Sequence, residues 1–357
     1  MKKIIYALLF IAAIQSCKEP VGNQQSILLP LVEKQGKDVD SKEYFIPQNI
    51  TPLKETTDFH IREIKKIESF NNENYVLCIN NQDVLAVFNN SGEKVREIGR
   101  WGNGHGEHGQ ITDFCIDKKN KRVIMLCANS LVMVYSVSGE FVSEKILSKS
   151  VFGNIASLDG NVLCTTNHQT FTEGDDAFLF YVFDENFNLL KKHTQVLPDY
   201  MSMFSLLTSP LKIVNDRFVY SDFYTHRIYF LDSVGNLLFT YDYENKNLMP
   251  SKMFREYDLF SENQQKYGFI LDNIVINDTI LSIYKTIDQV RLALHHGDGE
   301  IIEDFHIVGS FPKLFSTDGN KIISVTTIEG LEKMKTVNYE KDPDIFFYIV
   351  KYEINRH

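Results

Sequence analysis

Basic residues are scarce relative to acidic ones in this sequence of 357 residues: 37 Lys and Arg stand against 47 Asp and Glu, for a formal net charge of −10. Such a chain lacks the broad basic face that contacts with nucleic-acid phosphates require. Proline and tryptophan are also scarce, with 9 and 1 residues, whereas 26 Phe and 17 Tyr are present. We therefore expect no nucleic-acid partner, and a globular chain built from pleated sheets rather than a helical bundle.

Local motifs of known active sites are absent as well. The sequence contains no Gly-x-Ser-x-Gly, no His-Glu-x-x-His, no phosphate-binding loop and no EF-hand pattern. From motifs we therefore predict no catalytic residue, no metal site and no cofactor, and we favour a non-enzymatic role. Enzymatic activity stays open, because an active site assembled from several distant segments leaves no local signature.

The N-terminus carries the pattern of an export signal. Lys2 and Lys3 precede an apolar run from Ile4 to Ile14, which is too short to span a bilayer comfortably. The run ends in Ile-Gln-Ser-Cys, residues 14–17, which resembles the lipobox of bacterial lipoproteins. We therefore predict a signal peptide over residues 1–16 and lipid attachment at Cys17. The alternative is a buried N-terminal helix with an incidental cysteine.

The residues after this cysteine form a polar stretch that reaches Asp40. We predict that residues 17–42 are a lipidated tether and that residues 43–357 form a single folded domain. The tether would hold the domain at the outer membrane of the cell envelope. Only Glu19 is acidic directly after the cysteine, so periplasmic and surface-facing placements both remain open.

The remaining cysteines each lie inside an apolar run of the kind that fills a strand core: Cys78, Cys115, Cys127 and Cys164. We interpret them as small buried hydrophobic residues. A disulfide framework, which an exported protein can form, or a metal site is the alternative. No Cys-x-x-Cys pair supports it.

From Asp58 onward the chain is a succession of short apolar or alternating runs separated by Asn, Asp and Gly. Similar hairpin sequences recur at spacings of 47, 48 and 48 residues, beginning at Val87, Val134, Val182 and Phe230. This period fits four strands per blade of a β-propeller. A more distant copy begins at Ala293, and a last strand follows Asp344.

These repeats predict an all-β, six-bladed propeller with four antiparallel strands per blade. The last unit lacks its outer strand, and the segment from Glu43 to Pro52 before the first unit is the available substitute. An N-terminal strand would then close the last blade and remove an open sheet edge.

The second repeat carries a family resemblance. It contains Ile98-Gly99-Arg100, then Gly-x-Gly-x-Gly-Glu over residues 102–107, then an apolar strand that ends at Asp117. This stretch resembles an NHL-type repeat, of the NHL/TolB-like propellers, and more closely the six-bladed propeller lipoproteins of Bacteroidota. The resemblance implies a ligand scaffold or interaction platform, and in some relatives an enzyme. The family usually has Pro where His105 stands and an aromatic residue where His108 stands.

Loop lengths distinguish the two faces of the predicted propeller. One face has only tight turns, whereas the other carries every long connection, such as residues 100–110, 166–176 and 244–266. Long loops on a rigid scaffold are where binding groups concentrate. We therefore predict a ligand-binding site on the long-loop face, with these candidate residues: Arg100, Trp101, His105, His108, His168, Tyr224, His226 and Arg255.

Aromatic and polar residues of this kind suit a glycan or a protein partner, for example within a nutrient-uptake system. Two alternatives stay open. One is a glycan-directed hydrolase or lyase, in which one of the four histidines acts as acid or base and Arg100 or Arg255 holds a substrate carboxylate. The other is a structural subunit of an envelope complex.

Overall fold

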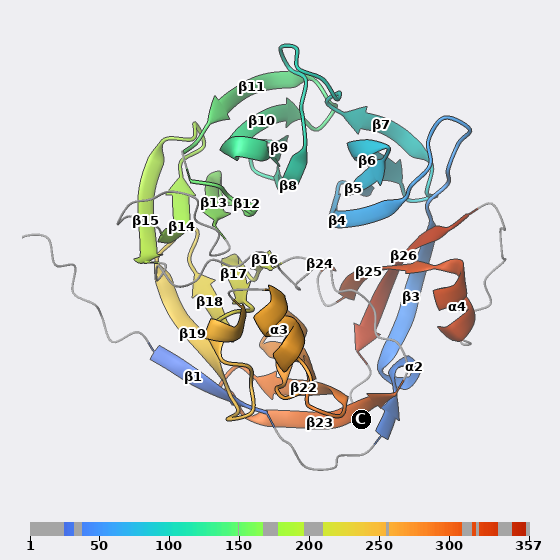
Figure 1. Cartoon of the computed structure of the whole chain (residues 1–357). Helices are drawn as coiled ribbons and strands as arrows, with labels where there is room; N and C mark the ends of the chain where they lie inside the picture. The colour runs from blue at the N-terminus through green and yellow to red at the C-terminus, as the bar shows by residue number, and fades with distance from the viewer. Residues whose placement is uncertain are drawn as a thin grey trace, which may run out of the picture.

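Six β-sheets follow one another around a central axis (Figure 1). They belong to a computed structural model that describes residues 25–31, 38–148, 150–166, 178–195, 210–254, 257–308, 316–318, 321–334 and 345–354. The predicted signal peptide, Cys17, His168 and Arg255 lie outside these residues. The all-β, six-bladed propeller predicted from the repeats is confirmed.

The first three blades are four-stranded antiparallel sheets. Blade 1 consists of β4 (Glu63–Phe70), β5 (Glu73–Asn80), β6 (Gln82–Asn89) and β7 (Lys94–Ile98). Blade 2 consists of β8 (Ile111–Asp117), β9 (Arg122–Cys127), β10 (Leu131–Ser136) and β11 (Phe141–Ile146). Blade 3 consists of β12 (Asn154–Leu158), β13 (Asn161–Thr165), β14 (Phe178–Phe183) and β15 (Leu189–Gln195).

The other three blades include strands from the N-terminal part of the chain. Blade 4 consists of β16 (Leu211–Val214), β17 (Arg217–Asp222), β18 (Arg227–Leu231), β19 (Leu237–Glu244) and β1 (Gln25–Pro30). Blade 5 consists of β20 (Phe269–Ile276), β21 (Thr279–Lys285), β22 (Val290–His296), β23 (Ile301–Val308) and β2 (Asp38–Asp40). Blade 6 consists of β24 (Ser316–Asp318), β25 (Lys321–Thr327), β26 (Phe347–Ile354) and β3 (Phe45–Pro52).

Blade 6 closes the ring as the sequence predicted. Its outer strand is β3, which pairs antiparallel with β26 from Tyr348↔Pro52 to Ile354↔Phe45. Residues near the two ends of the chain therefore share one sheet, and the last blade gains the strand that its own repeat lacks. This arrangement removes one open edge from the propeller.

The predicted tether over residues 17–42 is wrong in part, because two of its segments are folded onto the propeller. β1 pairs in parallel with β19, and β2 pairs in parallel with β23. Leu29 of β1 is fully buried, and Leu31 is 7% exposed. The folded domain therefore begins well before residue 43, and the N-terminal segment covers the outer edges of blades 4 and 5.

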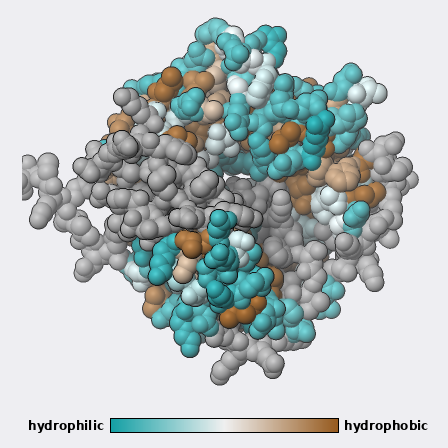
Figure 2. Space-filling model, viewed as in Figure 1, coloured by the Kyte–Doolittle hydropathy of each residue, from teal (hydrophilic) through white to brown (hydrophobic). Residues whose placement is uncertain are grey.

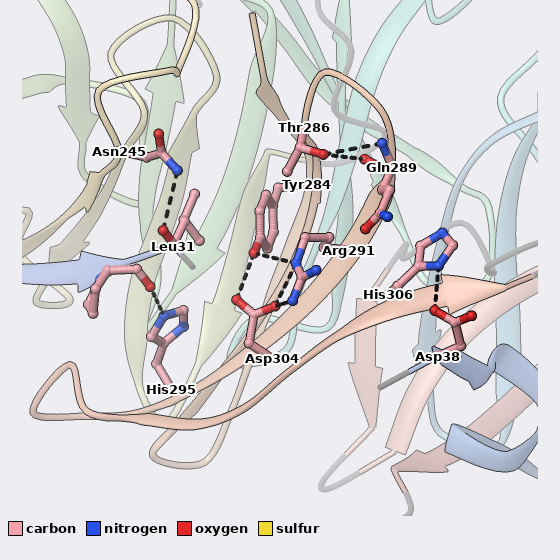
Figure 3. A network of polar contacts seen from close by, with 11 residues as sticks. Leu31, Asp38, Asn245, Tyr284, Thr286, Gln289, Arg291, His295, Asp304 and His306 are labelled. Carbon is pink, nitrogen blue, oxygen red and sulfur yellow. Dashed lines mark hydrogen bonds and ion pairs between the residues drawn. The ribbon is translucent and has the colours of Figure 1, made fainter. Parts of the chain in front are cut away.

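Polar contacts reinforce this covering (Figure 3). Nε2 of His295 donates to the carbonyl oxygen of Pro30 at 2.9 Å, and Nδ1 of His306 lies 2.9 Å from a carboxylate oxygen of Asp38. Behind them, the fully buried Arg291 donates to Asp304 at 2.5 and 2.8 Å. His295 of β22 and His306 of β23 therefore connect blade 5 to the N-terminal segment through side-chain contacts.

Apolar residues of neighbouring blades pack against one another and form the core. One cluster joins blades 1 and 2 through residues such as Leu85 and Phe114, and the next joins blades 2 and 3 through residues such as Ile124 and Tyr181. The four described cysteines are all buried and free, as predicted. Burial raises the pKa of the Cys78 thiol to about 12.

Among the described residues, short helices are confined to connections. They are α2 (Ser41–Tyr44), η1 (Ala128–Ser130), η2 (Ser251–Phe254), α3 (Tyr257–Asn263) and α4 (Ile328–Met334). Phe254 of η2 and Phe260 of α3 are buried against Phe223 and Phe269, so this segment covers the core. Among the described residues no helix is long and apolar enough to cross a membrane.

Candidate functional site

The inner strands of three blades contain a β-bulge near the start, and each bulge is followed by a charged residue. The extra residue lies between Ile64 and Lys66 in β4, between Ile111 and Asp113 in β8, and between Ile270 and Asp272 in β20. A bulge changes the direction in which the next side chains point. Lys66, Asp113 and Asp272 are each at most 6% exposed, so the wall of the central channel is charged but shielded from solvent.

Lys66 joins the first two blades inside this channel. Its Nζ donates to the carbonyl oxygen of Phe114 at 2.6 Å and lies 2.9 Å from Asp113 and 3.3 Å from Glu68. Burial opposes the charge on Lys66, but the carboxylates of Asp113 and Glu68 outweigh it and raise the pKa of the ammonium. Burial also raises the pKa of Glu68, by more than Lys66 lowers it. The three N–H groups of Lys66 therefore all face oxygen atoms.

Carboxylates of the channel also connect blades through backbone groups. Asp113 accepts a hydrogen bond from the backbone N of Ile155 in blade 3 at 2.9 Å. Glu68 accepts one from the backbone N of Ile116 in blade 2 at 3.1 Å. These contacts satisfy both partners in a buried place, where an unpaired group would be costly.

A second lysine, Lys212 of β16, lies in the channel wall formed by blade 4. Its side chain is 8% exposed, and its Nζ donates to the carbonyl oxygen of Asn273 at 2.9 Å. Among the described residues its nearest carboxylate oxygen belongs to Asp272, 3.9 Å away. The charge of Lys212 is therefore compensated by fewer oxygen atoms than that of Lys66, and burial lowers the pKa of Lys212.

These residues border a cavity of about 80 Å³, which is room for several water molecules. Five of the six inner strands or the turns that follow them line it, with these residues: Lys66, Glu68, Ser69, Cys115, Ile116, Lys118, Ala156, Leu211, Lys212, Ile213, Ser316 and Thr317. Ser69 and Thr317 are next to the last residues of their strands, so the cavity lies toward the short-turn face. Figure 2 views the opposite face and shows a hollow near the middle of the ring.

The loop between β7 and β8, which contains several predicted site residues, is held in place by hydrogen bonds and an ion pair within the loop. Arg100 Nη2 donates to Glu107 at 2.7 Å, and a Glu107 oxygen also accepts from the backbone N of Gly104 at 2.9 Å. The backbone N of His108 donates to the carbonyl oxygen of Arg100 at 2.8 Å. Arg100 has a side chain 81% exposed, and Trp101 is 41% exposed.

This loop lies against the outer strand of blade 2. The ring of His105 stands edge to face with Phe141 at 4.8 Å between centroids, and its Nδ1 lies 4.0 Å from Glu144. The side chain of His105 is 81% exposed. In Figure 1 the loop projects at the rim of the ring, between β7 and β11. Arg100, Trp101 and His105 are therefore available to a partner at the rim.

The other described candidates are buried and contribute to packing. His108 is 2% exposed and stands edge to face with Trp101 at 6.2 Å. Tyr224 is 3% exposed, and His226 is 8% exposed with its Nε2 donating to the carbonyl oxygen of Met249 at 2.9 Å. Burial lowers the pKa of His226 and favours its neutral form. The expectation that these three side chains are presented to a ligand is not met here.

The described residues of the predicted site therefore lie in two separate places and do not form one site. Arg100, Trp101 and His105 follow blade 1, whereas Tyr224 and His226 belong to blade 4, and no contact joins the two groups among the described residues. Within the same residues no group of three or more His, Cys, Asp and Glu side chains could hold a metal ion. Of the described candidate histidines, His105 lies 4.0 Å from the carboxylate of Glu144, whereas Nε2 of His226 donates to a backbone carbonyl.

Sequence reasoning missed the channel cluster. The signal was present as isolated charges in otherwise apolar inner strands, such as Lys66 in EIKKIESF and Asp272 in FILDNIVI. A charge inside a predicted inner strand must face either the channel or a neighbouring blade, because that strand has no solvent-facing side.

The chain belongs to the DUF5128 family of six-bladed β-propellers, whose family model matches residues 23–295. The match begins before β1, which agrees with a folded domain that includes the N-terminal strands. No curated protein matches the sequence.

Two solved structures of Bacteroides proteins show the same fold at low sequence identity. A protein of Bacteroides fragilis described as exported superposes with a TM-score of 0.69 at 16% identity, over 93% of this chain and 100% of that one. A DUF4221 family member of Bacteroides vulgatus gives a TM-score of 0.58 at 11% identity, over 88% and 98% of the two chains. BamB of Moraxella catarrhalis gives 0.47 at 11% identity, over 86% and 99%.

Proposed function

We propose that this protein is a lipid-anchored binding module of the bacterial cell envelope, and that it binds a protein partner through the rim loop formed by residues 99–110. The observation that carries the proposal is the exposure of Trp101 and His105 on a loop whose backbone is fixed. The ion pair between Arg100 and Glu107 and the hydrogen bonds around it hold the loop before any partner arrives. A preformed loop loses little conformational freedom on binding.

A protein partner fits this geometry better than a glycan. Trp and Arg are the residue types that most often dominate protein–protein binding energy. The loop projects from the rim rather than lining a concave platform (Figure 1). Close to it, Ile146 at the end of β11 is 68% exposed, and by strand alternation it shares a face with Glu144, which His105 approaches. Together these residues offer a small apolar surface with a charged border.

The lipid anchor rests on the N-terminal sequence, in which a short apolar run ends at Cys17. A structural relative at 16% identity is described as exported, which accords with an extracytoplasmic location.

Site-specific photo-crosslinking tests the binding surface. A photoreactive amino acid at Trp101 of the full chain in its native host should give one defined protein adduct, and this adduct should weaken when Arg100 is changed to Ala. The matched control is the same amino acid at Leu238, which is 39% exposed on β19 of blade 4. Equal adducts from both positions, or none from position 101, would contradict the proposal.

Fatty-acid labelling tests the anchor separately. The full chain should incorporate an alkyne-bearing fatty acid and sediment with membranes, and Cys17→Ser should lose both properties. A Cys17→Ser protein that still carries the label would place the lipid elsewhere and refute the anchor assignment.

A further inference from the structure

The central cavity contains two buried lysines that are compensated to different degrees. Lys66 has three oxygen partners within 3.3 Å, from Phe114, Asp113 and Glu68. Lys212 has one oxygen partner within hydrogen-bond distance among the described residues, the carbonyl of Asn273 at 2.9 Å. An ammonium group has three N–H donors. The geometry therefore leaves donors on Lys212 that no described protein oxygen accepts.

The carboxylates around the cavity cannot serve these donors. Glu68 is committed to Lys66 and to the backbone N of Ile116. Asp272 lies 3.9 Å from Nζ of Lys212 and accepts a hydrogen bond from the backbone N of Asn273 at 2.8 Å. Burying an ammonium without full compensation is costly, so a second acceptor near Lys212 would be strongly favoured.

The remaining lining makes the cavity favourable for an anion. Lys118, at the exposed end of the wall after β8, is the third lysine of the lining, beside Lys66 and Lys212. Among the described lining residues Glu68 is the only carboxylate, and it is paired with Lys66, as Asp113 just outside the lining is. Ser316, Thr317 and Ser69 supply hydroxyl groups on the opposite wall, and two of these hydroxyls donate elsewhere: Ser316 to Ile67 and Ser69 to Asn74.

We propose that the central cavity is a binding site for a small organic carboxylate, with Lys212 as the residue that pairs with the carboxylate group. A volume of about 80 Å³ limits the ligand to a few non-hydrogen atoms within the cavity. Lys118 at the border suits a second carboxylate at the other end of the ligand, so short dicarboxylates should bind more tightly than acetate. This site is independent of the rim loop. The propeller would then bind a small molecule in its central cavity in addition to a protein partner at its rim.

The experiment is a titration of the folded chain, with Cys17 changed to Ser, against acetate, succinate and sulfate at constant ionic strength. Calorimetry and the melting temperature both report binding, because a ligand that binds only the native state raises apparent stability. Succinate should bind and raise the melting temperature. Lys212→Gln should weaken its affinity by roughly tenfold or more, the value of one charge-assisted hydrogen bond.

Two variants keep the test sharp. Lys252→Gln, at an exposed position in η2, should bind succinate like the wild type. Lys212→Met removes the ammonium and leaves Asp272 without that nearby cation, so its melting curve is used first to check that it is folded; the folded variant should bind no probe. No binding by the wild type, equal binding by Lys212→Gln, or a preference for sulfate over both carboxylates would overturn the proposal.

Discussion

The Nζ atom of Lys66 lies 2.9 Å from Oδ1 of Asp113, and the two side chains are only 8% and 6% exposed. This ion pair connects the inner strand of blade 1 with that of blade 2 at the channel wall. Both residues directly follow a β-bulge in their strands. The charged channel is therefore part of how neighbouring blades are held together, as well as a place where a ligand can bind.

Removal of Lys66 should strongly destabilise the propeller. Lys66→Met leaves the buried carboxylates of Asp113 and Glu68 without their cation, and breaking a buried pair in this way costs about 3–5 kcal/mol. The control is Lys54→Met, whose partner Glu93 lies 3.3 Å away at the surface with side chains 45% and 58% exposed; it should cost less than about 1 kcal/mol. Urea unfolding measures both. Equal costs would show that the channel pair is not structurally important.

The N-terminal strand β1 should contribute to stability through one side chain. Leu29→Ala should lower the free energy of unfolding by about 2–4 kcal/mol, because Leu29 is fully buried between blade 4 and blade 5. Its neighbour Leu28 is 53% exposed, so Leu28→Ala should change stability by less than about 0.5 kcal/mol. Denaturant midpoints give the comparison. If the two substitutions had the same effect, β1 would not be packed as described.

Ring closure should be sensitive to one glycine. Gly92 has a φ of +78°, and a Cβ atom there would lie 1.5 Å from the carbonyl oxygen of Pro52 in β3. Gly92→Ala should therefore cost more than about 2 kcal/mol, from backbone strain and steric overlap. Gly109→Ala meets no atom within 4 Å and should be close to neutral. Melting temperatures distinguish these outcomes, and a neutral Gly92→Ala would contradict the contact between blade 1 and β3.

Stability should fall below neutral pH because of buried histidine. Burial lowers the pKa of His226 in the folded state, whereas the unfolded chain has the ordinary value of about 6.5. The unfolded state therefore binds the proton first, and the contribution of neutral His226 is lost as the pH falls from about 7 toward 5. Burial lowers the pKa of His295 as well, so the two effects add.

Substitution isolates the contribution of His226. His226→Gln should flatten the dependence of the free energy of unfolding on pH between about 7 and 5. His296→Gln changes an exposed histidine of the turn after β22 and serves as the control. An unchanged slope in His226→Gln would mean that this histidine takes up its proton equally well in the folded state.

The architecture was predictable from sequence because the repeats contain similar turn residues at the same positions. Turns between the two outer strands begin with Asn89, Asp184 or Asp232, whose side-chain oxygen accepts backbone N–H groups two and four residues later. Glycine usually follows at a positive φ, as Gly92 and Gly235 do. Phe187 occupies the same place in blade 3 with a φ of +59°, and its burial against Arg122 explains why the repeat tolerates it.

The features that could not be predicted depend on contacts distant in sequence. β1 looked like part of a tether because its pairing partner lies more than two hundred residues away, and a parallel partner leaves no hairpin signal. The exposure of the rim residues could not be predicted either. His108 and His105 have the same side chain and lie in the same loop, but only His108 is buried. The contacts among the charged residues of the channel could not be predicted either, because they form only when the ring brings the inner strands of different blades together.

We propose that the loop of residues 99–110 provides the binding surface for a protein partner. The dissociation constant of the partner captured by crosslinking tests this proposal when it is measured with the wild type, Trp101→Ala and the control Leu238→Ala. We predict that Trp101→Ala raises the dissociation constant by about thirtyfold or more, as expected for a residue worth about 2 kcal/mol at the centre of an interface, while Leu238→Ala has no effect. Equal affinities for all three proteins would contradict the account.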